Sequence, residues 1–123
     1  MLTDRSIRRG DLYWIAAEDH GSAAGVQHPH LVVQDDVFNR SRLTTVVVCA
    51  LTSNLHRASE PGTVLLDVGE GNLNKQSVVL ASQISSLDAA LLGERIGALS
   101  DERVEQVLAA LRFLQATYFG DGR

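Results

Sequence analysis

The chain has 123 residues and a mass of 13.3 kDa, which fits one domain and leaves little room for a second. Apolar residues make up 45% and charged residues 21%, a composition that excludes a disordered chain and predicts a core that needs no disulfide or structural metal. The net charge of −4 argues against a protein that coats nucleic acid by charge alone, although it permits a local basic groove.

The first part of the chain predicts two strands separated by a long loop. Residues 12–17 are apolar and rich in aromatic and branched side chains, which predicts a strand buried on both faces. Residues 18–29 are small and polar, which is typical of a mobile loop with a functional role. The next strand, residues 30–34, begins after Pro29, and Asp35 is placed to cap one helical turn.

The remainder predicts three more strands and one long helix. Residues 44–51 are dominated by valine and threonine, and residues 63–67 and 77–84 follow after glycine-rich turns. Ser100 is the expected N-cap of a helix whose apolar side chains recur at helical spacing until Gly120. The order predicts a mostly β fold with a C-terminal helix, in which the helix packs on a small, strongly bent, mostly antiparallel sheet or open barrel.

Cys49 is the only cysteine, so the chain has no internal disulfide framework. It lies in an apolar run, which predicts a small buried side chain rather than a reactive thiol. The N-terminus does not resemble a signal peptide, and no apolar run approaches the roughly 20 residues that span a bilayer. We therefore expect a cytoplasmic protein that makes no use of a membrane.

Several motifs of familiar enzymes are absent from the sequence, including nucleotide-binding glycine loops, paired zinc-binding cysteines and the GxSxG elbow. His28 and His30 would share one face of a strand and could suggest a metal site. The two remaining histidines, His20 and His56, lie in separate loops, so nothing fixes a third ligand. The sequence predicts no metal ion and no cofactor.

A polar cluster connects the long loop with the end of the valine-rich strand. Its members are Ser22, Gln27, His28, Thr52 and Ser53. Antiparallel strands would bring these side chains together at the rim of one sheet. A histidine takes up and returns a proton near neutral pH, and a hydroxyl donates to developing negative charge. The alternative is that these residues only form turns and caps.

Four segments follow one another in a distinctive order. They are RGDLYW at residues 9–14, GS at 21–22 with HPHLVVQDD at 28–36, TVVVCALTS at 45–53, and SVVLASQISSLD at 77–88. In this order and spacing they resemble the MazF/PemK-type toxin endoribonucleases, the toxins of type II toxin–antitoxin systems. The resemblance runs from about residue 9 to residue 114.

The resemblance implies a fold and a set of partners. The fold would be a small SH3-like open barrel of about five to seven short strands with a C-terminal helix. It would form a single domain over residues 1–123, with flexible ends at 1–8 and 119–123. The partners would be single-stranded RNA, a second copy of the chain in a homodimer, and an antitoxin protein that binds the same groove.

The resemblance also implies metal-independent cleavage of RNA, in which the 2′-hydroxyl attacks and leaves a 2′,3′-cyclic phosphate and a 5′-hydroxyl. Thr52 matches the family's catalytic threonine, and His28 would act as base or phosphate contact. Substrate-binding residues would be Ser22, Gln27, Ser53, Arg9 and Gln83. Arg40 and Arg42 would add to a positive rim, and Trp14 or Phe38 could stack a base, although core packing is the simpler role for Trp14.

Three positions depart from the family pattern. His28 stands where the family has an arginine, which exchanges a fixed charge for a group suited to proton transfer. This departure allows three outcomes: catalysis with His28 as the base, a changed substrate, or lost activity. Ala23 and Ser82 replace acidic residues found in many members, which bears on substrate preference.

Two hypotheses follow. The first is a ribonuclease toxin that uses His28 and Thr52. The second is a catalytically silent homologue, a regulatory dimer that binds an antitoxin-like peptide in the same groove.

Overall fold

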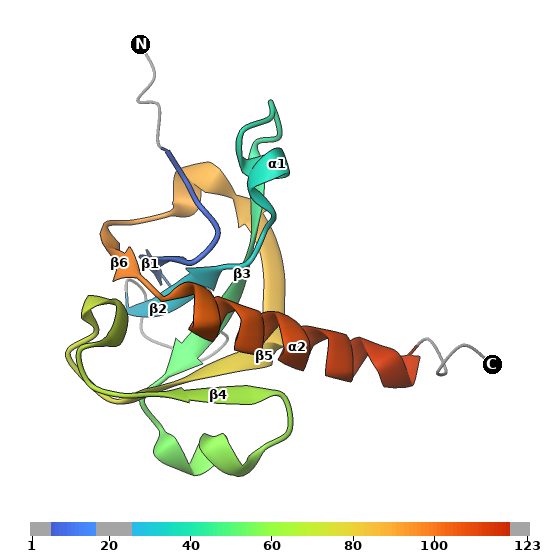
Figure 1. Ribbon diagram of the computed structural model, residues 1–123. Coiled ribbons are helices and arrows are strands. Elements are labelled where there is room, and N and C mark those ends of the chain that lie inside the picture. The colour runs from blue at the N-terminus through green and yellow to red at the C-terminus, as the bar shows by residue number, and fades with distance from the viewer. Residues whose placement is uncertain (1–5, 17–25, 119–123) are drawn as a thin grey trace.

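The computed structural model describes residues 6–16 and 26–118 and places six strands in one sheet (Figure 1). The strand order is β4-β5-β3-β2-β1-β6, and all pairings are antiparallel. The strands are β1 (Asp11–Ala16), β2 (Gln27–Val32), β3 (Thr45–Thr52), β4 (Thr63–Leu66), β5 (Ser77–Asp88) and β6 (Arg95–Ala98). The helices are α1 (Asp36–Asn39) and α2 (Asp101–Tyr118), with 3₁₀ turns η1 (Leu55–Ser59), η2 (Glu70–Asn72) and η3 (Ala89–Leu91).

Two apolar clusters lie on opposite faces of the central strands. Leu12 and Leu31 belong to the first cluster, which also receives Val104 and Val107 from α2. Tyr13 and Val32 belong to the second. Neighbouring residues of β1 and β2 therefore point into different clusters, as the alternation of side chains along a strand requires. This explains why these strands have continuous apolar runs, and it confirms that β1 is buried on both faces.

The longest strand, β5, bends where its pairing with β3 changes register. Cys49 pairs with Ile84, whereas the next residue, Ala50, pairs with Leu80. Extra residues on one strand of a pair bend that strand and increase its twist. Beyond this bend β5 continues to Asp88, four residues past the predicted end, because the polar segment 85–88 still pairs with β3.

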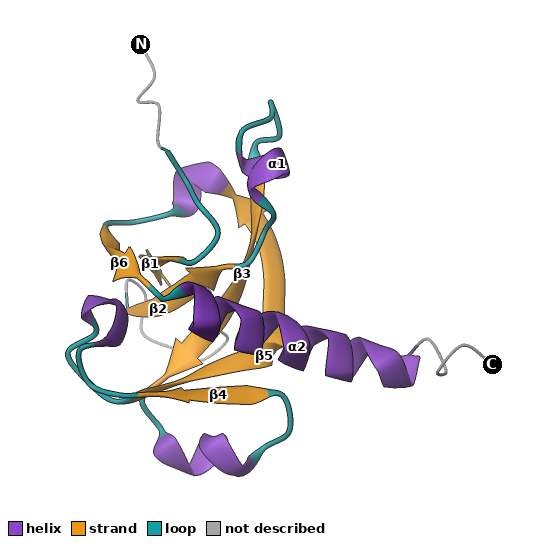
Figure 2. Cartoon of the chain, in the orientation of Figure 1, coloured by secondary structure: helices purple, strands orange, loops and turns teal. Residues whose placement is uncertain are grey.

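The helix α2 crosses the sheet and contacts β4 and β5 (Figure 2). Ser100 is its N-cap, since its hydroxyl oxygen accepts from the Arg103 amide at 3.2 Å and its carbonyl accepts from the Val104 amide. In the first turn of α2, Arg103 forms two hydrogen bonds to the carboxylate of Glu70, at 2.8 and 2.9 Å. This pair fixes η2 to the first turns of the helix.

The predicted fold class is confirmed: the described part of the chain is mostly β, with six strands and a C-terminal helix. Asp35 caps the predicted helical turn, accepting from the Val37 amide at 2.9 Å. Cys49 is fully buried, as predicted, and burial raises the pKa of its thiol to about 12. No described helix has the length and hydropathy needed to cross a membrane.

Some boundaries differ from the prediction. β2 begins at Gln27, so Pro29 lies inside the strand rather than before it. The short strand β6 was not predicted, because four residues that include an arginine and a glycine carry too weak a pattern. The expected flexible ends, 1–8 and 119–123, and the mobile loop from residue 18 lie mostly outside the described residues.

Candidate functional site

His28 lies at the start of β2 and Thr52 at the end of β3, so both lie at the same end of two neighbouring antiparallel strands. The pairing of β2 with β3 runs from His30–Ala50 to Val32–Val48. His28 and Thr52 each lie two residues beyond the His30–Ala50 pair. Because side chains two residues apart share a face, both project from the same side. The start of β2 and the end of β3 therefore bring together the histidine and the threonine that the sequence singled out.

A cavity of about 600 Å³ opens at this edge. His28 and Gln27 line it from β2, and Thr52 and Ser53 line it from the end of β3. Four of the predicted site residues thus share one cavity. Its other lining residues are Trp14, Pro29, Leu51, Asn72, Leu73, Asn74, Lys75, Ser77, Glu94, Arg95 and Ile96.

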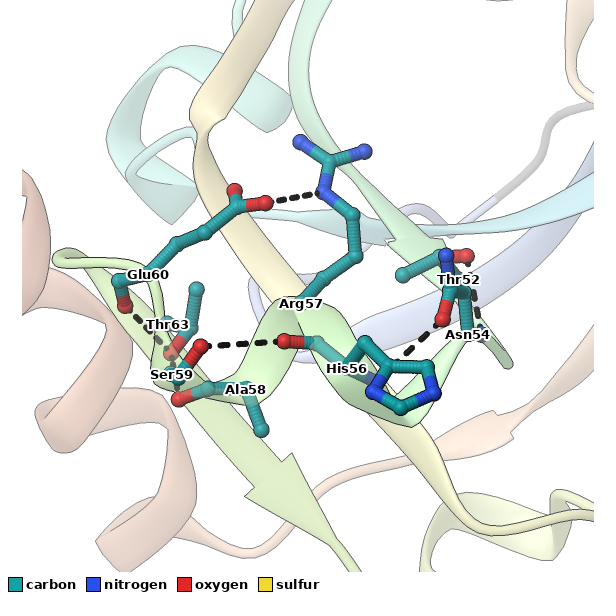
Figure 3. A network of polar contacts seen from close by, with 8 residues as sticks. All are labelled: Thr52, Asn54, His56, Arg57, Ala58, Ser59, Glu60 and Thr63. Atoms are coloured by element: carbon teal, nitrogen blue, oxygen red, sulfur yellow. Dashed lines mark hydrogen bonds and ion pairs between the residues drawn. The ribbon is translucent and has the colours of Figure 1, made fainter.

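The turn after β3 holds the side chain of Thr52 (Figure 3). The hydroxyl oxygen of Thr52 accepts a hydrogen bond from the Asn54 amide at 3.1 Å, and the Asn54 side chain accepts from the His56 amide at 3.2 Å. Further along η1, Arg57 pairs with Glu60 at 2.7 Å. The Thr52 oxygen is therefore fixed while its hydroxyl hydrogen is left to donate, and this is the arrangement needed to stabilise negative charge.

A third wall comes from η2 and β6. Asn72 has a left-handed backbone, with φ of 67°, and its side chain donates to the carbonyl of Ile96 at 3.0 Å. A β-carbon on Gly97 would lie 2.3 Å from the carbonyl oxygen of Gly71, so the two segments pack backbone to backbone. Lys75 continues this wall, and its backbone carbonyl accepts a hydrogen bond from the Ser77 hydroxyl at 3.0 Å. Residues 70–75 are therefore held in place by hydrogen bonds and by backbone packing against β6.

The charges around the cavity are mixed. Arg95 pairs with the buried carboxylate of Asp11 at 3.1 Å, and Glu94 lies next to it in the lining. Lys75 and the exposed imidazole of His28 face the same space. The cavity therefore combines Arg95, which is paired, and Lys75, which has no ion-pair partner among the described residues, with the imidazole of His28.

The three described histidines, His28, His30 and His56, are not part of a cluster of metal ligands. His30 Nδ1 is 2.9 Å from the carbonyl oxygen of His28, and burial lowers the pKa of His30 while that hydrogen bond acts in the opposite direction. Across residues 6–16 and 26–118, no three His, Cys, Asp or Glu side chains gather as a metal site would require. The chemistry that these residues offer is proton transfer and hydrogen bonding.

The structure places other predicted site residues elsewhere. Arg9 donates to the Val33 carbonyl at 2.8 Å and lies 3.8 Å from the Asp35 carboxylate. Gln83 is exposed at the bend of β5. Neither lines the cavity, and Ser22 lies outside the described residues.

Of the residues predicted to form a positive rim or to stack a base, only Trp14 lines the cavity of His28 and Thr52. Arg40 lines a second polar cavity, of about 610 Å³, together with Arg8. Arg42 is exposed in the turn before β3, and Phe38 is 54% exposed on α1. Trp14 is half-buried and lines the cavity of His28 and Thr52, so it combines packing with access to a ligand.

Comparison with known proteins agrees with this arrangement. The family model for PemK-like, MazF-like toxins of type II toxin–antitoxin systems matches residues 8–114. The chain belongs to this toxin family. Among curated members, it is 35% identical over 107 residues to endoribonuclease MazF2 of Mycobacterium bovis and to endoribonuclease MazF6 of Mycobacterium tuberculosis. Each match covers 86% of this chain and 94% of the relative.

Solved structures share the toxin fold. MazF of Deinococcus radiodurans superposes with a TM-score of 0.72 at 24% identity, covering 92% of this chain and 99% of that one. A mycobacterial endoribonuclease gives 0.70 at 23% identity, covering 94% and 93%. A mycobacterial endoribonuclease in complex with its cognate antitoxin gives 0.67 at 24% identity, covering 95% and 96%. The predicted membership and fold are thereby confirmed.

Sequence reasoning did not find the third wall. The sequence pattern assigns Asn72 and Asn74 to a turn and gives Lys75 no role, and Glu94 and Arg95 belong to a segment with no predicted structure. The sequence does carry one feature that singles out this wall, because Lys75 is the only lysine of the chain.

Proposed function

We propose that this toxin is an endoribonuclease that cleaves single-stranded RNA without a metal ion. The observation that supports it most directly is that a proton acceptor, His28, and a fixed hydroxyl donor, Thr52, line one cavity. The curated relatives at 35% identity are named endoribonucleases. The alternative of a catalytically silent regulatory dimer is not favoured, because it gives no reason for this pair.

RNA supplies its own nucleophile in this reaction, which explains why no metal is needed. His28 removes the proton of the 2′-hydroxyl, whose oxygen forms a bond to the adjacent phosphorus. The bond from phosphorus to the 5′ oxygen then breaks, and that oxygen takes a proton from water. Thr52 donates to the phosphoryl oxygen on which negative charge increases. The products are a 2′,3′-cyclic phosphate and a 5′-hydroxyl, and DNA, which lacks the 2′-hydroxyl, is not a substrate.

The remaining cavity residues position the RNA. We assign Gln27 and Ser53 to hydrogen bonds with the nucleotide at the cleaved linkage. Ser22, which lies outside the described residues, stays a predicted contact of the RNA. Trp14 offers an aromatic surface on which a base can stack. Arg9 and Gln83 do not line this cavity, so they would contact only those nucleotides of the RNA that extend beyond it. Unpaired RNA is the expected substrate because its bases are free to be read.

The test is to incubate the purified protein with a long single-stranded RNA in excess EDTA and to analyse the new ends. We expect cleavage that survives chelation, yields cyclic phosphate ends, and is lost in Thr52→Ala. Intact RNA at high protein concentration, or cleavage that stops in EDTA, contradicts the proposal.

We also propose that the chain acts in the cytoplasm as a homodimer and is inhibited by a protein antitoxin in the same groove. A structural neighbour was solved with its cognate antitoxin, which supports a protein inhibitor for this chain. Light scattering of the purified protein tests the dimer. The expected mass is twice the 13.3 kDa of one chain, and a monomer at micromolar concentration contradicts it.

A further inference from the structure

Lys75 is the only lysine in the chain, and it lines the same cavity as His28 and Thr52. It lies two residues before β5, on the wall formed by η2. Its side chain is exposed. Proteins usually carry several lysines over their surface. Here the single lysine lies in the cavity of His28 and Thr52, which suggests that it has a role there.

The backbone that carries Lys75 is held from several sides. Glu70 is bound to Arg103 of α2 by two hydrogen bonds of 2.8 and 2.9 Å. Asn72 donates to the Ile96 carbonyl at 3.0 Å, and the carbonyl of Lys75 itself accepts from Ser77 at 3.0 Å. Such anchoring limits the positions of the ammonium group to those that its own flexible stem allows.

The charge of Lys75 is not compensated within the described structure. Among residues 6–16 and 26–118, no carboxylate forms an ion pair with its ammonium group and no side chain hydrogen-bonds to it. The neighbouring cation behaves differently, because Arg95 is paired with the buried carboxylate of Asp11 at 3.1 Å. Lys75 is therefore the cation of this cavity that is available to an anionic ligand.

The position of His28 makes such a cation necessary. An imidazole that holds a phosphate by charge must be protonated, whereas one that accepts the proton of the 2′-hydroxyl must be neutral. One side chain cannot do both in the same step. Since the family pattern has a permanently charged arginine at this position, a histidine there leaves the charged role to another residue.

We propose that Lys75 binds the phosphodiester that is cleaved and supplies the fixed positive charge, so that neutral His28 can act as the base. This proposal rests on the proposed ribonuclease function and deepens it. The lysine ammonium is a compact charge with three donors, suited to a phosphate whose negative charge increases in the transition state.

Because Lys75 is unique, its accessibility can be measured on the unmodified protein. The protein is treated with a limiting amine-acetylating reagent, with and without an RNA whose 2′-hydroxyls are methylated to prevent cleavage. Mass spectrometry then quantifies acetylation at Lys75 and at the N-terminal amine, which serves as the internal control. We expect the RNA to lower acetylation of Lys75 at least tenfold relative to the N-terminus. Equal acetylation with saturating RNA overturns the proposal.

Variants give an independent readout. Lys75→Gln should weaken binding of the methylated RNA about tenfold and lower the dependence of log Kd on log salt by about 0.7, the value for one phosphate contact on a single strand. Lys75→Arg keeps the charge and should restore both values. The matched control, Arg112→Gln, removes the same charge from the exposed face of α2 and should change neither.

The two proposals fail in different ways. If wild-type protein cleaves RNA while Lys75→Gln binds and cleaves like wild type, Lys75 has no role and the ribonuclease function stands. If RNA protects Lys75 and Lys75→Gln weakens binding, but unmodified RNA stays intact, the phosphate site stands and the ribonuclease proposal is wrong.

Discussion

The hydroxyl oxygen of Thr52 accepts a hydrogen bond from the Asn54 amide at 3.1 Å. This contact fixes the oxygen and leaves its hydrogen free to donate, and in the described residues the hydroxyl has no acceptor. The turn after β3 thus prepares a donor before any substrate arrives. Donors that are oriented in advance stabilise developing charge better than donors that must reorganise.

Replacing Thr52 by valine should remove this donor while keeping the shape of the side chain. We expect the rate constant for RNA cleavage to fall by about 10² to 10³, the usual effect of losing one oriented donor. Thr52→Ser retains the hydroxyl and should stay within about tenfold of wild type. Single-turnover cleavage measures both, and thermal unfolding confirms that each variant is folded. A valine variant as fast as wild type would remove Thr52 from the mechanism.

His28→Arg separates the two roles open to this position. If His28 is the base, the arginine variant should lose activity, because guanidinium does not accept a proton. The measurement is single-turnover cleavage of one RNA by the wild-type protein and by the arginine variant at the same pH. An arginine variant that cleaves faster than wild type would instead assign His28 to weak phosphate binding.

The pair of Glu70 and Arg103 predicts a pH-dependent contribution to stability. The Arg103 hydrogen bonds hold the pKa of Glu70 below its ordinary value of 4.5. A carboxyl with a lowered folded-state pKa stabilises the fold above its unfolded pKa, and the contribution is lost as pH falls through the folded value. Glu70→Gln should therefore cost about 1 kcal/mol at pH 7. Urea unfolding at pH 7 and below pH 4 should show this difference shrinking at acid pH, and a constant difference would contradict it.

Gly97→Ala should be strongly destabilising. Its new β-carbon would lie 2.3 Å from the carbonyl oxygen of Gly71, and that backbone cannot withdraw without moving the cavity wall. We expect a loss of about 2 kcal/mol or more in the free energy of unfolding. Gly69→Ala is the matched control: its β-carbon meets nothing within 4 Å, so it should cost only about 1–2 kcal/mol for its left-handed backbone, with φ of 94°. Equal losses in the two variants would show that the close contact does not matter.

The strands with long apolar runs could be predicted from the sequence because burial on both faces makes the pattern continuous. β1 and β3 were located to within one residue at each end. The placing of His28 and Thr52 at one cavity could also be anticipated, since it depends only on β2 and β3 being antiparallel neighbours. Ser100 was identified as a helix cap because that role follows from local chemistry.

The third wall could not be predicted, and the reason is physical. β6 is a strand because β1 pairs with it and because Gly97 permits close packing against Gly71. Both conditions depend on residues more than 20 positions away, which local propensity does not report. The position of Lys75 in the cavity follows from that packing, so its role became visible only in the folded chain.

In the proposed reaction RNA supplies the nucleophile, and His28 and Thr52 act on it in one cavity without a metal ion. The most direct measurement compares two versions of an RNA that the protein cleaves at a mapped linkage, identical except for one 2′-hydroxyl replaced by hydrogen at that linkage, both in EDTA. We predict that the unmodified RNA yields a 2′,3′-cyclic phosphate and that the single deoxy substitution abolishes cleavage there. Cleavage of the deoxy-substituted linkage at a comparable rate would contradict the account.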